Sequence, residues 1–146
     1  MPLHPFRPLS ALTAYWGEET LGRSARWSDP GLIREGLFLL GELPRTASNS
    51  VLLATDLHAG NVLQAQREPW LVIDPKPFVG DPAFDATQHL LNGMVRLRAE
   101  PLGTIRRFAE LLGVDFGRVR LWMFARLAAE PRDEWRHDDR LDIART

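Results

Sequence analysis

Two long stretches of the chain place apolar residues at the three- and four-residue spacing of an amphipathic helix. Asp29-Pro30 supplies an N-cap followed by proline at the first helical position, and the stripe behind it predicts a helix over about residues 30–42 that ends before Pro44. Asp81-Pro82 repeats this signal and predicts a helix over about residues 82–98. Capping aspartates therefore mark the starts of both helices.

Three shorter stripes complete the helical pattern. They predict a helix over about residues 9–16, a helix over 105–112 that is closed by Gly113 at the C′ position, and a helix that begins after Asp115. The apolar stripes are expected to form one core, which comprises Leu9, Leu12, Trp16, Ile33, Leu37, Leu40, Phe84, Leu91, Met94, Val95, Ile105, Phe108, Leu111, Leu112, Val119, Trp122, Met123 and Leu127.

Short apolar runs between the helices are typical of strands. Val51-Leu52-Leu53 is too short for a helix and suits a buried strand, which ends at Asp56. The runs 62–63 and 70–73 flank a polar segment and predict a β-hairpin whose second arm ends at Asp74. The predicted fold class is therefore mainly α with a small β-hairpin.

The length of 146 residues and the hydrophobic share of 45% indicate a single globular domain. Residues 1–28 are rich in proline, tryptophan and small residues, and they are interpreted as a lead-in. Residues 131–146 are interpreted as a charged tail, either a solvated terminal helix or a frayed end.

Charge and composition exclude several classes of partner. The 18 basic and 19 acidic side chains give a net charge of -1, so no long-range field attracts nucleic acid. No apolar run is long enough for a membrane span and the N-terminus lacks a signal peptide, so we expect a cytoplasmic protein without a membrane partner. The absence of cysteine leaves the chemistry to Asp, Glu, His, Ser and Thr, and Lys76 is the only lysine.

The densest group of polar residues lies in three segments, 55–61, 73–75 and 80–85. Asp29, Asp81 and Asp115 are explained as helix caps. Asp56 and Asp74 are different, because each follows an apolar run expected to be buried, where a charge is costly unless it serves a ligand, a metal or an ion pair.

The spacing around Asp56 matches the catalytic loop of kinases, which reads Asp-Leu-x-x-x-Asn. In that loop the aspartate accepts the proton of the substrate hydroxyl, and the asparagine binds Mg²⁺. Asp56 and Asn61 occupy these positions, and the hairpin is long enough to return Asp74 to the same metal. The order of these residues favours phosphoryl transfer.

Three longer strings, 56–63, 70–77 and 80–85, resemble the aminoglycoside phosphotransferase family. Ile73-Asp74-Pro75-Lys76-Pro77 points to its streptomycin 6-kinase and hydroxyurea phosphotransferase branch, and the likeness extends from about Leu32 to about Glu130. The resemblance implies the C-terminal lobe of a protein-kinase-like fold, with ATP as phosphoryl donor, Mg²⁺ as metal and a small-molecule hydroxyl as acceptor.

The resemblance also implies a role for each matching residue. Asp56 is expected to be the catalytic base, and Asn61 and Asp74 are expected to be metal ligands. Asp81 and Asp85 are expected to support the loop.

The sequence departs from the family in two ways. The family usually has His-Gly before the catalytic aspartate, whereas this chain has Ala54-Thr55, and His58 either substitutes in part or is an ordinary hydrogen-bonded loop residue. No Gly-x-Gly occurs, and Lys76 follows the loop, so the N-terminal nucleotide lobe and its lysine are absent from these residues. We therefore expect the isolated lobe to be inactive as an aminoglycoside kinase.

Two other enzyme classes are weaker interpretations. The segment 17–24 imitates a phosphate-binding P-loop with arginine in place of lysine, but it lacks a preceding buried strand. Asp56-Leu57-His58 and Gly80-Asp81 imitate a dinuclear metallophosphoesterase, but the further ligands would have to be His89 and His137, which look isolated.

The remaining alternative is a non-catalytic binding module derived from a kinase lobe. Acids near the C-terminus could contact a cationic aminoglycoside or form a solvated face; they are Glu130, Asp133, Glu134, Asp138 and Asp139. Apolar surface is expected where a nucleotide lobe would dock, which favours self-association or a partner. Trp16, Trp27, Phe38 and Phe78 are candidates for that surface, although core burial is expected for each.

Overall fold

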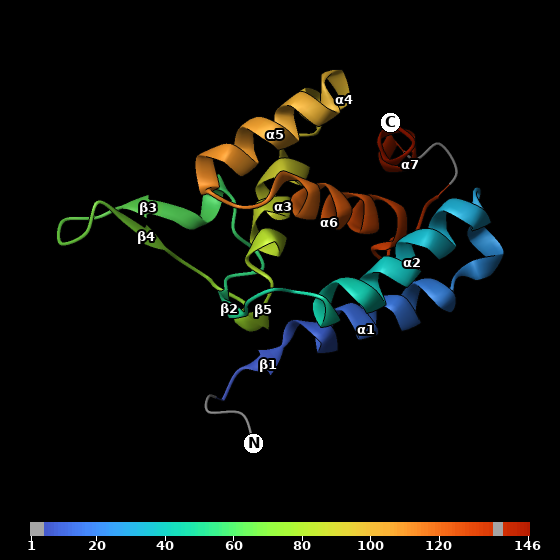
Figure 1. Cartoon of the computed structure of the whole chain (residues 1–146), viewed down its shortest axis with the longest axis horizontal. Coiled ribbons are helices and arrows are strands. Elements are labelled where there is room, and N and C mark those ends of the chain that lie inside the picture. Colours follow the sequence, from blue (N-terminus) through green and yellow to red (C-terminus); the bar gives the residue numbers. More distant parts are fainter. Residues whose placement is uncertain (1–4, 136–138) are drawn as a thin grey trace.

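The computed structural model describes residues 5–135 and 139–146. It is mainly helical with a small sheet and a separate hairpin, which confirms the predicted fold class (Figure 1). The helices are α1 (Leu9–Leu21), α2 (Pro30–Arg45), α3 (Pro82–Asn92), α4 (Met94–Ala99), α5 (Pro101–Leu112), α6 (Phe116–Ala129) and α7 (Asp139–Ala144), with short 3₁₀ turns at Ser24–Arg26 and Ala59–Asn61. The strands are β1 (Arg7–Pro8), β2 (Val51–Leu53), β3 (Val62–Gln64), β4 (Trp70–Val72) and β5 (Phe78–Gly80).

Helices α2 and α6 form the centre of the molecule, and α1 packs on the outer side of α2 (Figure 1). The close approach of α2 and α6 depends on Gly36, because a Cβ atom there would lie 2.8 Å from the Cβ of Ala128 and 2.9 Å from that of Ala129. Trp122 and Phe84 meet edge to face in the core, with ring centroids 5.1 Å apart.

The structure confirms the predicted caps. The side chains of Asp29, Asp81 and Asp115 accept hydrogen bonds from the backbone N–H groups of the first turns of α2, α3 and α6. Gly113 ends α5 in the left-handed conformation, with φ of 67°. The sequence therefore predicted these helix boundaries for the right physical reason.

The three-stranded sheet has the order β1-β5-β2, and it joins the first residues of the described chain to its middle. β1 pairs with β5 in parallel, and β2 pairs with β5 in antiparallel register, with Leu52 opposite Val79. The β3–β4 hairpin is a separate ribbon that projects from the helices, with Leu63 opposite Leu71 (Figure 1).

The predicted burial of the strands was wrong in part. Only Leu53 of β2 is buried. Trp70 and Leu71 in the hairpin are 64% and 51% exposed, and Ile73 is exposed too, because the hairpin projects away from the helical core. Asp74 therefore follows an exposed strand, and burial does not explain its position.

Several element boundaries also differ from the prediction. Helix α1 continues to Leu21, so much of the expected lead-in is a core helix. Helix α2 continues through Pro44, since a proline in the last turn removes only one intrahelical hydrogen bond. Residues 78–80, for which no strand was predicted, form β5, and the expected helix 82–98 is divided between α3 and α4 at Gly93.

The predicted core residues of α6 are buried, but some predicted core residues of other helices are exposed. Val95 and Leu111 are 88% and 82% exposed, and Leu112 is exposed as well. Phe38 is also exposed, contrary to the expected burial, whereas three other candidate aromatics, Trp16, Trp27 and Phe78, are partly buried.

Residues 139–144 of the expected tail form a packed helix and not a solvated helix or a frayed end. Helix α7 packs against α6, and its Ile143 belongs to the main core, whereas Leu141 packs with Ile33 of α2 and Trp135 in a second cluster. Among the described helices, none combines the length and the apolar character that crossing a membrane requires.

Candidate active site

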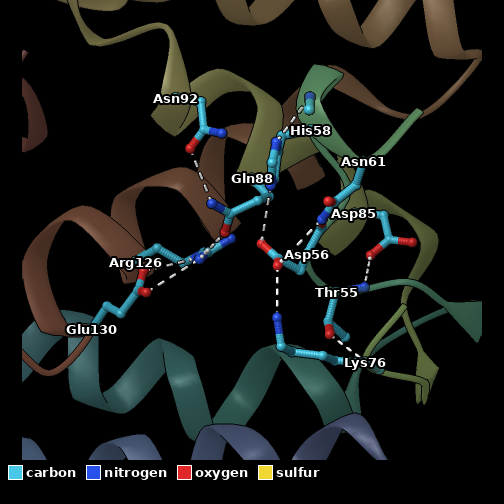
Figure 2. A network of polar contacts seen from close by, with 11 residues as sticks. Thr55, Asp56, His58, Asn61, Lys76, Asp85, Gln88, Asn92, Arg126 and Glu130 are labelled. Carbon is cyan, nitrogen blue, oxygen red and sulfur yellow. Dashed lines mark hydrogen bonds and ion pairs between the residues drawn. The ribbon is translucent and has the colours of Figure 1, made fainter. Parts of the chain in front are cut away.

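The loop of residues 54–61, here called the Asp56 loop, connects β2 to the hairpin and is held in place by Asp85 of α3. The two carboxylate oxygens of Asp85 accept hydrogen bonds of 2.8 Å from the N–H groups of Ala54 and Thr55 (Figure 2). Thr55 has a φ of 56°, which a β-branched residue rarely adopts, so these contacts stabilise a strained backbone. Asp85 thus holds the backbone at the start of the Asp56 loop.

The side chain of Asp56 lies at the centre of a polar network (Figure 2). Its Oδ2 atom accepts a hydrogen bond from Lys76 Nζ at 2.7 Å, and Asn61 Nδ2 donates to its backbone oxygen at 2.9 Å. The hydrogen bond from Lys76 lowers the pKa of Asp56, an effect that burial opposes in part. Asp56 is therefore ionised at neutral pH, and its carboxylate can accept a proton from a donor group.

Lys76 is the residue of this site that the sequence analysis did not place. Its backbone N–H donates to Ala54 O at 2.9 Å, and its backbone oxygen accepts from Thr55 Oγ1 at 2.6 Å. These two contacts fix the backbone of Lys76 against the residues that precede Asp56. The signal was present in the sequence, because the only lysine of the chain lies two positions after Asp74.

Asp74 is brought to the Asp56 loop by the hairpin. The N–H of the preceding residue, Ile73, donates to Asn61 O at 2.8 Å. The pKa of Lys76 is raised, first by its hydrogen bond to Asp56 and further by the charges of Asp56 and Asp74. Asp74 adopts a φ of 50° and is exposed. The two aspartates thus act on one ammonium group.

His58 is fixed within the loop by Gly60. Its Nδ1 accepts the N–H of Gly60 at 3.1 Å, so Nε2 is the atom that carries the proton in the neutral ring. A Cβ atom on Gly60 would lie 2.9 Å from the ring, so glycine is needed there. His58 Nε2 lies 3.7 Å from Asp56 Oδ1, too far for a hydrogen bond but close enough for electrostatic attraction when the ring is protonated.

Asp81 and Asp85 have different structural roles. Asp81 Oδ2 accepts hydrogen bonds from Arg118 Nε at 2.5 Å and Trp122 Nε1 at 2.8 Å, so Asp81 ties α3 to α6 and does not contact the loop directly. Burial raises the pKa of Asp85, while its two backbone hydrogen bonds and the charge of Arg126 oppose that rise.

Arg126 lies behind α3 and is almost completely buried. It donates to Thr87 at 2.7 Å, to Gln88 at 2.9 Å and to Glu130 at 2.9 Å, and the rings of two aromatic residues, Trp16 and Phe84, lie about 5 Å from its guanidinium carbon (Figure 2). This network fixes the helix that carries Asp85.

The residues around Asp56 fit a magnesium ion. The amide nitrogen of Asn61 is committed to Asp56, which leaves its Oδ1 atom as an acceptor, and Asp74 adds an exposed carboxylate. Oxygen ligands of this kind suit Mg²⁺, which usually completes its shell with water and phosphate. Within residues 5–135 and 139–146, no cluster of three or more His, Asp or Glu side chains forms a metal site of its own.

The geometry does not support the other two enzyme classes. Residues 17–21 of the P-loop imitation lie inside helix α1, so they form no phosphate-binding loop. Asp81 of the metallophosphoesterase motif is bonded to Arg118 and Trp122 and is not available as a ligand beside Asp56. His89 stacks on Phe108 at 4.7 Å, and His137 lies outside the described residues.

Comparison with known families gives the class of the chain, the antibiotic resistance kinases. The family described as aminoglycoside/hydroxyurea antibiotic resistance kinase matches residues 2–136, and the chain belongs to that family.

Curated relatives agree with this assignment. The chain is 42% identical over 112 residues to a hydroxyurea phosphotransferase of Kitasatospora aureofaciens, which covers 75% of this chain and 31% of that protein. It is 46% identical over 82 residues to a streptomycin 6-kinase of Streptomyces griseus, which covers 52% of this chain and 27% of that protein. The chain thus spans about a third of the length of these relatives. No solved structure matches the chain.

Proposed function

We propose that this chain carries the catalytic loop and metal ligands of an ATP-dependent kinase that phosphorylates a hydroxyl group of a small antibiotic-like molecule. The arrangement of Asp56, Asn61 and Lys76 carries the proposal, because it holds an ionised carboxylate beside candidate ligands for Mg²⁺. The helical lobe corresponds in this proposal to the C-terminal lobe of a protein-kinase-like fold.

In the proposed reaction the acceptor hydroxyl donates its proton to Asp56, while its oxygen attacks the terminal phosphorus of ATP. A new oxygen–phosphorus bond forms, the bond to the β-phosphate oxygen breaks, and ADP leaves. Mg²⁺, when bound, would supply positive charge that offsets the charge of the phosphates. Asn61 Oδ1 and the Asp74 carboxylate would hold that ion.

Lys76 has a positioning role in this proposal. One of its three N–H groups donates to Asp56 and fixes the carboxylate, which leaves two donors for solvent or a phosphoryl oxygen. The charges of Asp56 and Asp74 both act on the ammonium, which in this proposal would face the transferred phosphoryl group.

The proposal is tested in a chimera, in which the matching 112 residues of this chain replace those of the Kitasatospora aureofaciens relative. Acceptor-dependent phosphate transfer from ATP is measured with hydroxyurea as acceptor. We expect activity in the chimera and a loss of about 10²–10⁴-fold in kcat for Asp56→Asn, the range expected when a general base is removed.

The matched control is Asp115→Asn, since asparagine caps a helix as well as aspartate does. Asp74→Asn should increase the Mg²⁺ concentration needed for half-maximal rate. Equal rates for Asp56→Asn and Asp115→Asn, or a folded but inactive chimera, would contradict the proposed function.

A further inference from the structure

A broad hollow opens beside the Asp56 loop, between residues 57–60 and the helices α3, α4 and α5. It consists of two adjoining cavities of about 490 and 870 Å³ that share Ala59, His89 and Phe108 in their walls. It is here called the α3–α5 hollow. Its volume is sufficient for a small-molecule acceptor.

The α3–α5 hollow lies next to the candidate base, with His58 between the two. His58 lines the hollow, and its Nε2 atom lies 3.7 Å from Asp56 Oδ1. Figure 2 shows His58 beside Asp56, with Asn92 of α3 on the same side of the network. An acceptor that enters the hollow is therefore separated from Asp56 by one side chain.

The wall of the hollow combines an aromatic surface with positive charge. His89 and Phe108 stack at 4.7 Å and offer a flat face on which a ring can pack. Arg96 and Arg107 line the larger cavity. Arg107 also contacts Glu100 at 3.3 Å, but both side chains are about 60% exposed, so this pair is weak and Arg107 can turn to a ligand.

The same wall offers no carboxylate to a cation. Asp85 is the only acidic residue among the described residues that line the hollow, and both of its oxygens accept backbone hydrogen bonds. A polycationic acceptor would meet two guanidinium groups, of which only Arg107 has a carboxylate partner, the exposed Glu100.

The acidic residues near the C-terminus add no carboxylate to the hollow, and three of them are paired with arginines of the chain itself. Glu130 contacts Arg126 and Arg140, and Asp139 contacts Arg98. Asp133 contacts Arg23. Neither cavity of the hollow is lined by these acids.

We propose that the α3–α5 hollow binds a neutral or anionic polyhydroxylated acceptor and disfavours polycationic aminoglycosides. This inference rests on the proposed function, since it assigns the acceptor class of the same site. Arg96 and Arg107 supply the preference for an anion, and the His89–Phe108 stack supplies a surface for the ring.

The test measures binding to the 146-residue chain and does not require catalysis. Three probes share one cyclohexane ring with hydroxyl groups and differ in charge: myo-inositol 1-phosphate, myo-inositol and the dicationic streptidine. Each is titrated at low ionic strength, and dissociation constants come from the NMR signals of Ala59, Gly60 and His89. We expect the inositol phosphate to bind about tenfold more tightly than myo-inositol, and streptidine to bind most weakly.

Variants separate charge at the hollow from charge elsewhere. Arg96→Gln and Arg107→Gln should each reduce the affinity for the inositol phosphate by about five- to tenfold and leave myo-inositol unchanged. Arg106→Gln is the matched control, because Arg106 precedes Arg107 in α5 but lies over the Phe116 ring at 4.2 Å.

Two results would overturn the inference: streptidine binding at the hollow as tightly as myo-inositol, or no saturable shift at these signals with any probe. Either result would leave the loss of transfer in the Asp56→Asn chimera unaffected. Failure of the acceptor class and failure of the kinase proposal are therefore distinguishable.

Discussion

At the residue scale, the contact between Lys76 and Asp56 lowers the pKa of the candidate base. Removal of the ammonium in Lys76→Met should raise the pKa of Asp56 toward its usual value, because its strongest hydrogen-bond donor is lost. Titration of the Asp56 carboxyl carbon by NMR measures this shift. Arg45→Met removes a similar contact, between Arg45 and Glu42 at 2.6 Å, and should leave the pKa of Asp56 unchanged.

The same ion pair predicts how stability depends on pH. The pKa of Asp56 is lowered in the folded state, so the pair stabilises the fold above the unfolded value of 3.8 and this contribution is lost as pH falls through the lowered pKa. The pKa of Lys76 is raised, so the contribution is present below 10.5 and is lost as pH rises through the raised pKa. The difference in urea midpoint between the wild type and Lys76→Met should therefore be largest near neutral pH and shrink on both sides. A difference that stays constant down to pH 2 would contradict the assignment.

At the scale of elements, helix α3 holds the Asp56 loop through one carboxylate. Asp85→Asn replaces an acceptor by an amide nitrogen that faces a backbone donor, so we expect a loss of about 1–3 kcal/mol in the free energy of unfolding. Urea denaturation measures this loss, and hydrogen exchange should become faster at Ala54 and Thr55. Asp115→Asn keeps its cap and should change neither quantity much. Unchanged exchange at both amides would show that the loop does not depend on Asp85.

At the scale of the whole molecule, the exposed apolar hairpin is a surface for association. Leu71 is 51% exposed beside Trp70, and apolar patches of this kind mark contact sites. We expect the chain to self-associate with increasing concentration in sedimentation velocity experiments, and Leu71→Glu to weaken the association. Phe38→Ser, on the distant helix α2, is the control (Figure 1). A monomer at all concentrations would contradict this prediction.

At the same scale, we expect kinase activity to need more than these residues. Residues 1–146 contain no Gly-x-Gly, and their only lysine follows the Asp56 loop, so the glycine-rich loop and the preceding lysine that hold the phosphates in kinases have no counterpart in this sequence. The purified chain incubated with Mg²⁺-ATP and streptomycin should show no transfer above background, and nucleotide affinity of about millimolar at best. Efficient transfer would show that a separate phosphate-holding lobe is not needed.

The sequence by itself determined the starts of α2 and α3, because a capping aspartate and a following proline act within a few residues, and it determined the order of Asp56, Asn61 and Asp74 along the chain. It did not determine β5, the exposure of the hairpin or the length of α1, since these depend on pairing between segments far apart in sequence. Only the tertiary structure decided that Lys76 meets Asp56, that Asp85 holds the loop and that arginines line the α3–α5 hollow. The first two contacts join residues at least 20 positions apart, and the hollow lies between helices whose relative placement follows from packing around α2 and α6. Local sequence patterns extend over only a few residues, so they do not predict contacts over such separations.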